Sequence, residues 1–313
     1  MPHSHHRGRL PYIERDESWM YFNKRILLEA ARTDLPLLER FNYLGIYSNN
    51  LDEFFRVRVA SLRRIVGSLE PIPTHERRKA KETLRTIIRL NHEYSALFDR
   101  TFADLLQSLN EAHIHIINEQ ELTTDQEDEV LSFFMDKING ITNPIFINSP
   151  TFRPEQHLKE SLYLVVVLWH EQGEEELAHD VALLEVPTKE LGRFLRLRDK
   201  DGESYLMFLD DVLRYCLPYI FIGREYAQYE AYTFKFTKDA EFELEQDLRS
   251  SVIEMVSRGV KRRGRGEAVR VVYDEALSPE ILRRLSDMAE LNYRDMRIGG
   301  GRYHNMRDLM TLP

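Results

Sequence analysis

The chain has 313 residues, of which 42% are hydrophobic and 30% charged, and it carries a formal net charge of −9. A chain of this length and composition predicts a globular protein with a substantial core, and two domains are favoured over one. The acidic balance disfavours a surface that binds nucleic acid, and the single cysteine, Cys216, excludes an internal disulfide and a cysteine-based zinc cage. We therefore expect a cytoplasmic protein with no nucleic-acid partner.

No segment is suited to cross a membrane, because the longest apolar run, residues 162–169, is much shorter than the roughly 20 residues that a spanning helix needs. No signal-peptide pattern opens the chain, while peripheral membrane association stays open. Residues 1–10 contain three histidines and no apolar period, so we expect a flexible start and leave it out of the fold.

Two amphipathic helices are predicted next. Asp16 or Ser18 would cap the first, and its apolar residues share one face. These residues are Trp19, Phe22, Ile26 and Ala30. Pro36 suits the first turn of the second helix. The apolar side of that helix consists of Leu37, Leu38, Phe41, Leu44 and Tyr47.

The segment IYSNNLDEFF, residues 46–55, combines two amides with two acids where a third helix is predicted to begin. Asn50 and Glu53 have the spacing of an N-cap and its reciprocal capping acid. A carboxamide also carries a donor and an acceptor, so Asn49 and Asn50 are candidates for reading the edge of a neutral heterocycle such as adenine. Asp52 and Glu53 would place negative charge in the first turn, which disfavours phosphate there. From spacing alone, capping is favoured over ligand contact.

The third helix is expected over about residues 51–69. Its apolar stripe would be Leu51, Phe55, Leu62, Ile65 and Leu69. Arg58 falls in phase with this stripe, so we expect it to pair with an acid, either Glu53 or one on a facing helix. Prolines at 71 and 73 then break the chain, and residues 74–112 contain neither glycine nor proline. A helix of that length measures roughly 55–60 Å, so residues 1–112 are predicted to form an antiparallel helical bundle.

After residue 112 the apolar period changes from helical to alternating. Strands are predicted over residues 113–118, 144–148, 162–169, 181–186, 232–236 and 269–273. Helices are predicted from Thr124, with Glu127 completing a capping box, to about residue 138, and over residues 209–219, 240–258 and 279–291. Strands and helices mix without a regular βαβ rhythm, so residues 113–313 are predicted to form a mixed head domain and the fold class is α+β.

Several motifs are incomplete. His157 and Lys159 begin the H-x-K-x4-D signature of phospholipase D-type phosphoryl transfer, but Leu164 stands where the aspartate should be. The glycines at 299–301 lack the lysine and hydroxyl residue of a phosphate-binding loop, so a turn is favoured. His113 and His115 share one face of a strand without an evident third ligand, so packing or exposure is favoured over metal binding. We predict no catalytic residue and no metal site in these residues.

Basic residues gather in three short stretches. They are Arg56, Arg58, Arg63 and Arg64; Arg77, Arg78, Lys79 and Lys81; and Lys261, Arg262, Arg263, Arg265 and Arg270. Most such runs are solvated surfaces, and each is only a candidate for contact with a polyanion.

The sequences ESWMYFNKRILLEA at 17–30 and PLLERFNYLGIYSNNLDEFFRVRVA at 36–60 closely resemble the opening of the bacterial polyphosphate kinases. The resemblance continues through LLEVP at 183–187, FLDDVLRYCLPYIF at 208–221, FKFTKDAEFELEQD at 234–247, AVRVVY at 268–273 and GGRYHNMRDLMTLP at 300–313. It covers nearly the whole chain from Tyr12 onward. It departs at Asn42 and Tyr43, which replace the basic and phenylalanine residues expected before LGIYSNN.

The resemblance implies reversible transfer of the terminal phosphate of ATP to polyphosphate through a phosphohistidine, with Mg²⁺ offsetting the phosphate charge. In the family, two phospholipase D-like domains that follow the head carry that histidine and most of the Mg²⁺ site, and they are absent here. The portion at hand would be inactive alone and would form a homodimer or a higher homo-oligomer.

The resemblance also assigns residues. Asn50 matches the asparagine that contacts the nucleotide base in the family, and Asn49 is a weaker candidate. Arg56, Arg58, Arg262 and Arg263 are candidates for a polyphosphate path, because arginine binds phosphate oxygens bidentately. The alternative is a module for dimerisation and support without a ligand, in which Asn50 is only a helix cap.

Overall fold

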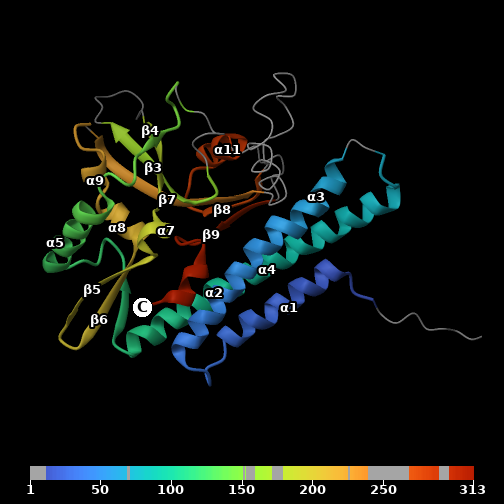
Figure 1. The fold of residues 1–313 in the computed structure, drawn as a ribbon, viewed down its shortest axis with the longest axis horizontal. Helices are drawn as coiled ribbons and strands as arrows, with labels where there is room; N and C mark the ends of the chain where they lie inside the picture. Colours follow the sequence, from blue (N-terminus) through green and yellow to red (C-terminus); the bar gives the residue numbers. More distant parts are fainter. Residues whose placement is uncertain are drawn as a thin grey trace, which may run out of the picture.

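The computed structural model places a helical bundle beside a mixed part with two sheets, which confirms the predicted α+β fold (Figure 1). The structure describes residues 12–68, 71–150, 152, 159–170, 179–224, 226–238, 268–288 and 296–313. The predicted flexible start at 1–10 and the predicted helix at 240–258 lie outside these residues.

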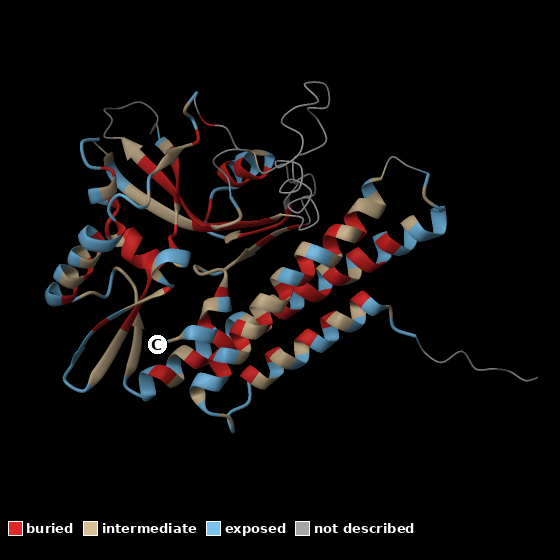
Figure 2. Cartoon of the chain, in the orientation of Figure 1, coloured by how far each residue is buried: buried red, intermediate tan, exposed pale blue. Residues whose placement is uncertain are grey.

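Three long helical segments form the bundle. α1 spans Arg15–Ala30, and α4 spans Thr74–Glu111 as the single long helix that its glycine- and proline-free sequence predicts. Between them, α2 (Leu37–Phe54), the π-helical turn η1 (Phe55–Val59) and α3 (Ala60–Gly67) follow one another directly. Their inward faces carry buried residues along their length (Figure 2).

The predicted start of a helix at residue 51 is wrong. Phe54 and Phe55 keep right-handed helical backbone angles, so the helix runs through Asn50 and on into η1. An N-cap must leave the helical region, and Asn50 is therefore not a cap. The apolar residues that follow explain the continuity, since Leu51, Phe54 and Phe55 are all buried and their packing outweighs the boundary signal of the polar pair.

The buried face of α1 is also displaced from the predicted one. It consists of Asp16, Met20, Asn23, Leu27 and Ala30. Phe22, predicted to be in the core, is 46% exposed, because the helix turns the polar Asp16 and Asn23 inward, where each has a partner. The cap is Glu14 rather than Asp16 or Ser18, since its carboxylate accepts the backbone N–H of Asp16 at 2.6 Å.

The larger sheet has six strands in the order β2-β4-β3-β7-β8-β9, antiparallel except between β8 and β9. Its strands are β2 (Ile145–Phe146), β3 (Leu162–His170), β4 (His179–Glu185), β7 (Tyr226–Lys238), β8 (Ala268–Asp274) and β9 (Arg297–Gly300). Alternate residues of β3 serve different cores. Tyr163, Val165 and Val167 join the core shared with the bundle, while Leu162, Leu164, Val166 and Leu168 join a second core under α5 and α8. This double burial explains the uninterrupted apolar run.

The smaller sheet has the order β1-β6-β5, and two of its strands were not predicted. β1 (Ile114–Ile117) lies parallel to β6 (Glu203–Phe208), which pairs antiparallel with β5 (Phe194–Lys200). Asp201 and Gly202 form the turn between β5 and β6, both with positive φ. Such a dipeptide is a hairpin signal, but the charged residues of β5 hide the alternation around it.

Shorter helices complete the head. They are α5 (Thr124–Phe133), η2 (Phe134–Ile138), α7 (Thr188–Leu191), α8 (Leu209–Tyr215), α9 (Leu217–Ile220), α11 (Pro279–Met288) and the 3₁₀ helix η4 (Met306–Thr311). The capping box of α5 lies one residue earlier than predicted, since Thr123 and Gln126 form it. The glycines predicted as a turn are also corrected, because Gly299 and Gly300 belong to β9.

The C-terminal segment returns to the bundle and lies against α2, with the C-terminus marked in Figure 1. Gly45 permits this approach, because a Cβ there would lie 2.6 Å from the Met310 Cγ and 2.8 Å from its backbone nitrogen. One apolar core therefore runs from the bundle helices to β7, β8 and η4. The domain division at 112/113 stays a prediction.

Candidate functional site

Asn49 and Asn50 lie near the end of α2 and face different neighbours. The Asn50 Nδ2 donates to the Asn23 Oδ1 of α1 at 3.3 Å, and the Asn23 Nδ2 donates to the backbone carbonyl of Tyr47 at 3.2 Å. Asn49 instead lines a polar cavity on the adjacent face of the helix. The two amides are thus separated by one helical step, with Asn50 toward α1 and Asn49 toward the sheet.

Three successive side-chain pairs connect α1 to α2 and η1. Asn23 contacts Asn50, the Trp19 ring stacks on Phe54 with centroids 4.1 Å apart, and Asp16 pairs with Arg58. These partners lie three or four residues apart on each helix, so they form consecutive steps of one antiparallel contact.

Arg58 therefore has the acid that its place in an apolar stripe requires. Its Nε and Nη2 donate to the two carboxylate oxygens of Asp16 at 2.9 and 3.1 Å. The facing helix α1 supplies the acid, one of the two predicted sources. Arg58 lines neither of the two cavities described here.

The polar cavity has a volume of about 420 Å³ and lies between α2 and the segments that precede β3 and contain α7 and η4. Asn49, Asp52, Glu53 and Arg56 line it from one face of the helix, because they recur at intervals of three or four residues. Five lining side chains are cationic and three are acidic. The cations are Arg56, Lys159, Lys189, Lys235 and Arg307, and the acids are Asp52, Glu53 and Glu160.

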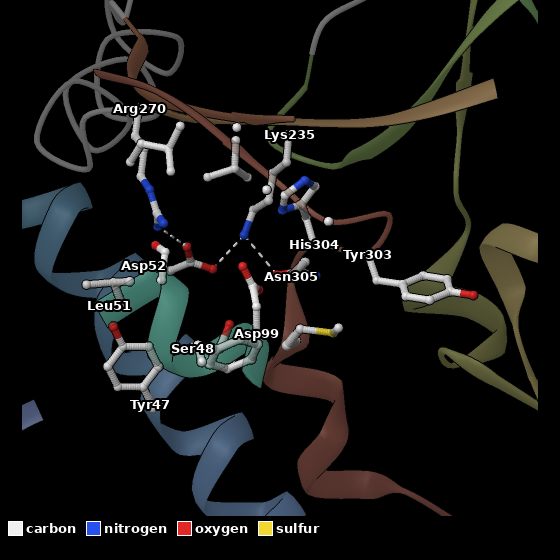
Figure 3. A pocket seen from close by; sticks show the side chains of 18 residues that line it. Tyr47, Ser48, Leu51, Asp52, Asp99, Lys235, Arg270, Tyr303, His304 and Asn305 are labelled. Carbon is white, nitrogen blue, oxygen red and sulfur yellow. Dashed lines mark hydrogen bonds and ion pairs between the residues drawn. The ribbon is translucent and has the colours of Figure 1, made fainter. Parts of the chain in front are cut away.

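Asp52 is the junction between the bundle and the large sheet (Figure 3). The Lys235 Nζ of β7 lies 2.6 Å from one carboxylate oxygen, and the Arg270 Nη1 of β8 lies 3.1 Å from the other. Lys235 also donates to the Asn305 Oδ1 at 2.8 Å. Burial disfavours the charged carboxylate, but the two cations outweigh it and hold the pKa of Asp52 below its ordinary value.

A second cavity, of about 90 Å³, lies on the other side of this junction and is lined by Tyr47, Asp99 and His304 (Figure 3). Asp52, Lys235 and Asn305 border both cavities and separate them. Burial lowers the pKa of His304 to about 3, so its imidazole is neutral at physiological pH. Among the described residues, neither the His304 Nε2 nor the Tyr47 hydroxyl has a hydrogen-bond partner.

The sequence did not single out several of these residues. Lys235 gave no such signal, because the alternation of FKF predicts a strand with the lysine on its solvent side, and only the fold shows that it is buried against Asp52. Lys159, Lys189 and Arg307 are isolated cations that only the fold brings together. Two predicted candidates, Arg262 and Arg263, lie outside the described residues, as does His157.

The remaining polar motifs are structural where the chain is described. His113 and His115 both contact the Glu203 carboxylate, at 2.8 and 2.6 Å, and so tie β1 to β6. Within the described ranges, no group of three or more histidine, cysteine or acidic side chains is arranged to hold a metal ion. Nor does any described helix have the length and apolar character needed to cross a membrane.

Comparisons with known proteins match both parts of the chain. Residues 12–117 match the family described as Polyphosphate kinase N-terminal domain, and residues 125–312 match Polyphosphate kinase middle domain. The chain is similar to the polyphosphate kinase of Yersinia pestis, with 34% identity over 308 residues, and to that of Escherichia coli K12, with 33% identity over 310 residues. Each alignment covers 96% of this chain and 43% of the relative.

A solved structure supports the same assignment. The crystal structure of polyphosphate kinase from Porphyromonas gingivalis superposes with a TM-score of 0.76 and 28% sequence identity. The match covers 97% of this chain and 41% of that one. The chain thus spans less than half the length of the relatives that it matches.

Proposed function

Because this chain belongs to the polyphosphate kinase family and holds its N-terminal and middle domains, we propose that it supplies the nucleotide-base contact of an enzyme that reversibly transfers the terminal phosphate of ATP to polyphosphate. The phosphohistidine of that reaction lies outside these residues. We place the Mg²⁺ site mainly outside these residues as well, as the resemblance to the family implies.

The observation that carries the proposal is the position of Asn50. Its carboxamide is half-buried at the contact between α1 and α2, and its one hydrogen bond to the described part of the chain uses Nδ2. The carbonyl oxygen is left to accept from a ligand, and the second N–H of the amide is left to donate. A neutral heterocycle with a donor beside an acceptor, such as adenine, suits this pair of groups.

The adjacent face of α2, where Asp52 and Glu53 were expected to disfavour phosphate, lines a cavity with more cations than acids and suits phosphate rather than a base. Asn49 and Arg56 lie there, on a cavity with an excess of cationic side chains from separate segments. Arginine and lysine bind phosphate oxygens through charge-assisted hydrogen bonds. We assign this cavity to the phosphates of ATP or to a stretch of polyphosphate. Arg58 is left out of this assignment, because Asp16 occupies its guanidinium.

The competing function is a module for dimerisation and support, within a homodimer or higher oligomer. The hydrogen bond from Asn50 to Asn23 favours it, because that bond alone gives Asn50 a structural use between two helices. The exposed apolar side chains of α1, with Tyr21 at 43%, Phe22 at 46% and Leu28 at 45%, are also available to a partner.

Nucleotide titration of the full-length protein separates these two functions. Asn50→Ala is expected to weaken binding of a non-hydrolysable ATP analogue about tenfold or more, the effect of losing a bidentate amide contact. Asn42→Ala, which changes an exposed asparagine of the same helix that lines neither cavity, is the matched control for the base contact. Unchanged affinity in Asn50→Ala, with the protein folded, would leave the supporting module as the function.

A further inference from the structure

We infer that Asn23, a buried residue of α1, fixes which end of the Asn50 carboxamide faces a bound base and so makes the site select a purine with an exocyclic amino group over one with a carbonyl. The inference rests on the proposed base contact of Asn50. It assigns Asn23 as a positioning residue, which itself touches no nucleotide.

Asn50, Asn23 and the backbone carbonyl of Tyr47 form a chain of hydrogen bonds, which we call the amide chain. The carbonyl sets its direction. The carbonyl of Tyr47 can only accept a hydrogen bond, so Asn23 must turn its Nδ2 toward it, at 3.2 Å. The Asn23 Oδ1 then faces Asn50, which must in turn offer its Nδ2, at 3.3 Å. The Tyr47 carbonyl thus orients Asn23, and Asn23 orients Asn50. The carbonyl itself is part of the helix backbone and cannot rotate.

The surroundings hold this arrangement in place. Asn23 is 1% exposed and lies between the buried Met20 and Leu27 on the inner face of α1. A flipped Asn23 would set two oxygens against each other and leave its amide hydrogens without an acceptor in an apolar interior, which is costly. One step away, the parallel stacking of Trp19 on Phe54 keeps α1 and α2 at a fixed separation.

The consequence for a ligand follows from the Asn50 groups that do not bond to Asn23. The Asn50 Oδ1 can accept from the exocyclic amino group of adenine, while the second Nδ2 hydrogen can donate to a neighbouring ring nitrogen. Guanine presents a carbonyl oxygen at the corresponding position, so two acceptors would face each other. The Asn50 amide cannot turn to relieve this contact without losing its bond to Asn23.

The test compares ATP with GTP in the full-length protein. Dissociation constants for non-hydrolysable analogues of both are measured by equilibrium titration in the wild type and in Asn23→Leu, which keeps an apolar side chain of similar size in the interior. The wild type is expected to prefer ATP by roughly ten- to a hundredfold, the range of a bidentate amide–purine pair. Asn23→Leu is expected to reduce that ratio at least fivefold, mainly by binding GTP more tightly.

Asn91→Leu is the matched control, because it also removes a fully buried asparagine from the bundle, on α4, but lies outside the amide chain. It is expected to keep the wild-type ratio. Unfolding midpoints of both variants confirm that folded protein is compared, and Asn23→Ala serves if Asn23→Leu does not fold.

The outcomes separate this inference from the proposed function. If Asn50→Ala weakens ATP binding but Asn23→Leu keeps the ATP-to-GTP ratio, the positioning role of Asn23 is refuted and the base contact stands. A wild type that binds ATP and GTP equally refutes it as well. If Asn50→Ala leaves ATP binding unchanged, the base contact and this inference are both refuted.

Discussion

The Asp16 carboxylate on α1 receives two hydrogen bonds from the Arg58 guanidinium on η1, and this pair lies at the other end of the helix contact that contains Asn23 and Asn50. The Asp16 side chain is 4% exposed and that of Arg58 is 36% exposed. Breaking the pair therefore costs more at the carboxylate, because it is the buried partner. Arg58 lies in a cluster of basic residues, yet its contacts give it a structural use.

Arg58→Met should therefore destabilise the fold by about 1–3 kcal/mol, because it removes two donors from a buried carboxylate and leaves it only the more distant, exposed Arg15. Urea unfolding measures the change. Arg32→Met removes ion pairs with Glu29 and Asp34 that are exposed to solvent, and it should destabilise the fold much less. Polyphosphate affinity should stay at the wild-type value in folded Arg58→Met, and a marked loss would return Arg58 to the polyphosphate path.

Asp52→Asn should destabilise the protein by about 3–5 kcal/mol, because Lys235 and Arg270 would keep their charges in a buried site without an acid. Denaturant unfolding of Asp52→Asn against Glu53→Gln is the measurement. Glu53 is the adjacent acid and is exposed, so its substitution should have little effect. Equal losses in the two variants would contradict the junction role of Asp52.

His304 should make the protein sensitive to mild acid. Its folded pKa is about 3 and its ordinary value is 6.5, so the unfolded chain binds a proton that the folded chain does not. The contribution of neutral His304 to the free energy of unfolding is fully present above pH 6.5. It is lost as the pH falls toward 3, by up to about 1.4 kcal/mol per pH unit. His304→Gln should lack this contribution, so its free energy of unfolding should fall less with pH than that of the wild type. Urea unfolding between pH 7 and 4.5 measures both, and equal falls in the two proteins would contradict the prediction.

The polar cavity should contribute to binding a phosphate chain. Arg56→Gln and Lys189→Gln are each expected to weaken polyphosphate binding severalfold and to reduce its salt dependence, since each removes a cation from the cavity. Arg32→Gln, an exposed arginine outside the cavity, is the control. Direct titration with polyphosphate of defined length at two salt concentrations gives both quantities, and unchanged affinity in both cavity variants would reject the assignment.

Residues 1–313 alone should make no polyphosphate from ATP. The chain covers 43% of the polyphosphate kinases of Yersinia pestis and Escherichia coli K12, and we propose that the phosphohistidine lies outside these residues. Incubation with labelled ATP and Mg²⁺, beside the full-length protein as the positive control, tests this. Labelled polyphosphate from residues 1–313 would show that the reaction needs nothing further.

The sequence predicted elements whose pattern is uninterrupted. α4 and β3 were foreseen because a long stretch without helix breakers and a continuous apolar run each permit one local structure. The helix start predicted after Asn50 was wrong, because residues that favour caps also occur inside helices when the flanking apolar residues are buried. β6 pairs with β1 across some 90 residues, which leaves no local trace, and the β5–β6 hairpin was missed because the charged residues of β5 hide its alternation.

The candidate site was harder to predict than the fold. Asn49, Asn50, Arg56 and Arg58 were identified from one segment, but their surroundings come from α1, the strands and the C-terminal segment. Asn23 was overlooked, although it lies four residues after Trp19 and three before Ile26, where an amide in phase with apolar residues needs a hydrogen-bond partner.

The alternation of β3 between two apolar cores has a consequence for folding. A slip of β3 by one residue would exchange its two sets of side chains yet carry none of residues 162–168 into water, so polarity gives this strand no protection against misalignment. Its correct alignment must come from the shapes of the two cores and from the flanking strands. Single changes of side-chain volume in β3 should therefore produce misaligned, aggregation-prone chains more readily than changes of polarity at the rim of the sheet.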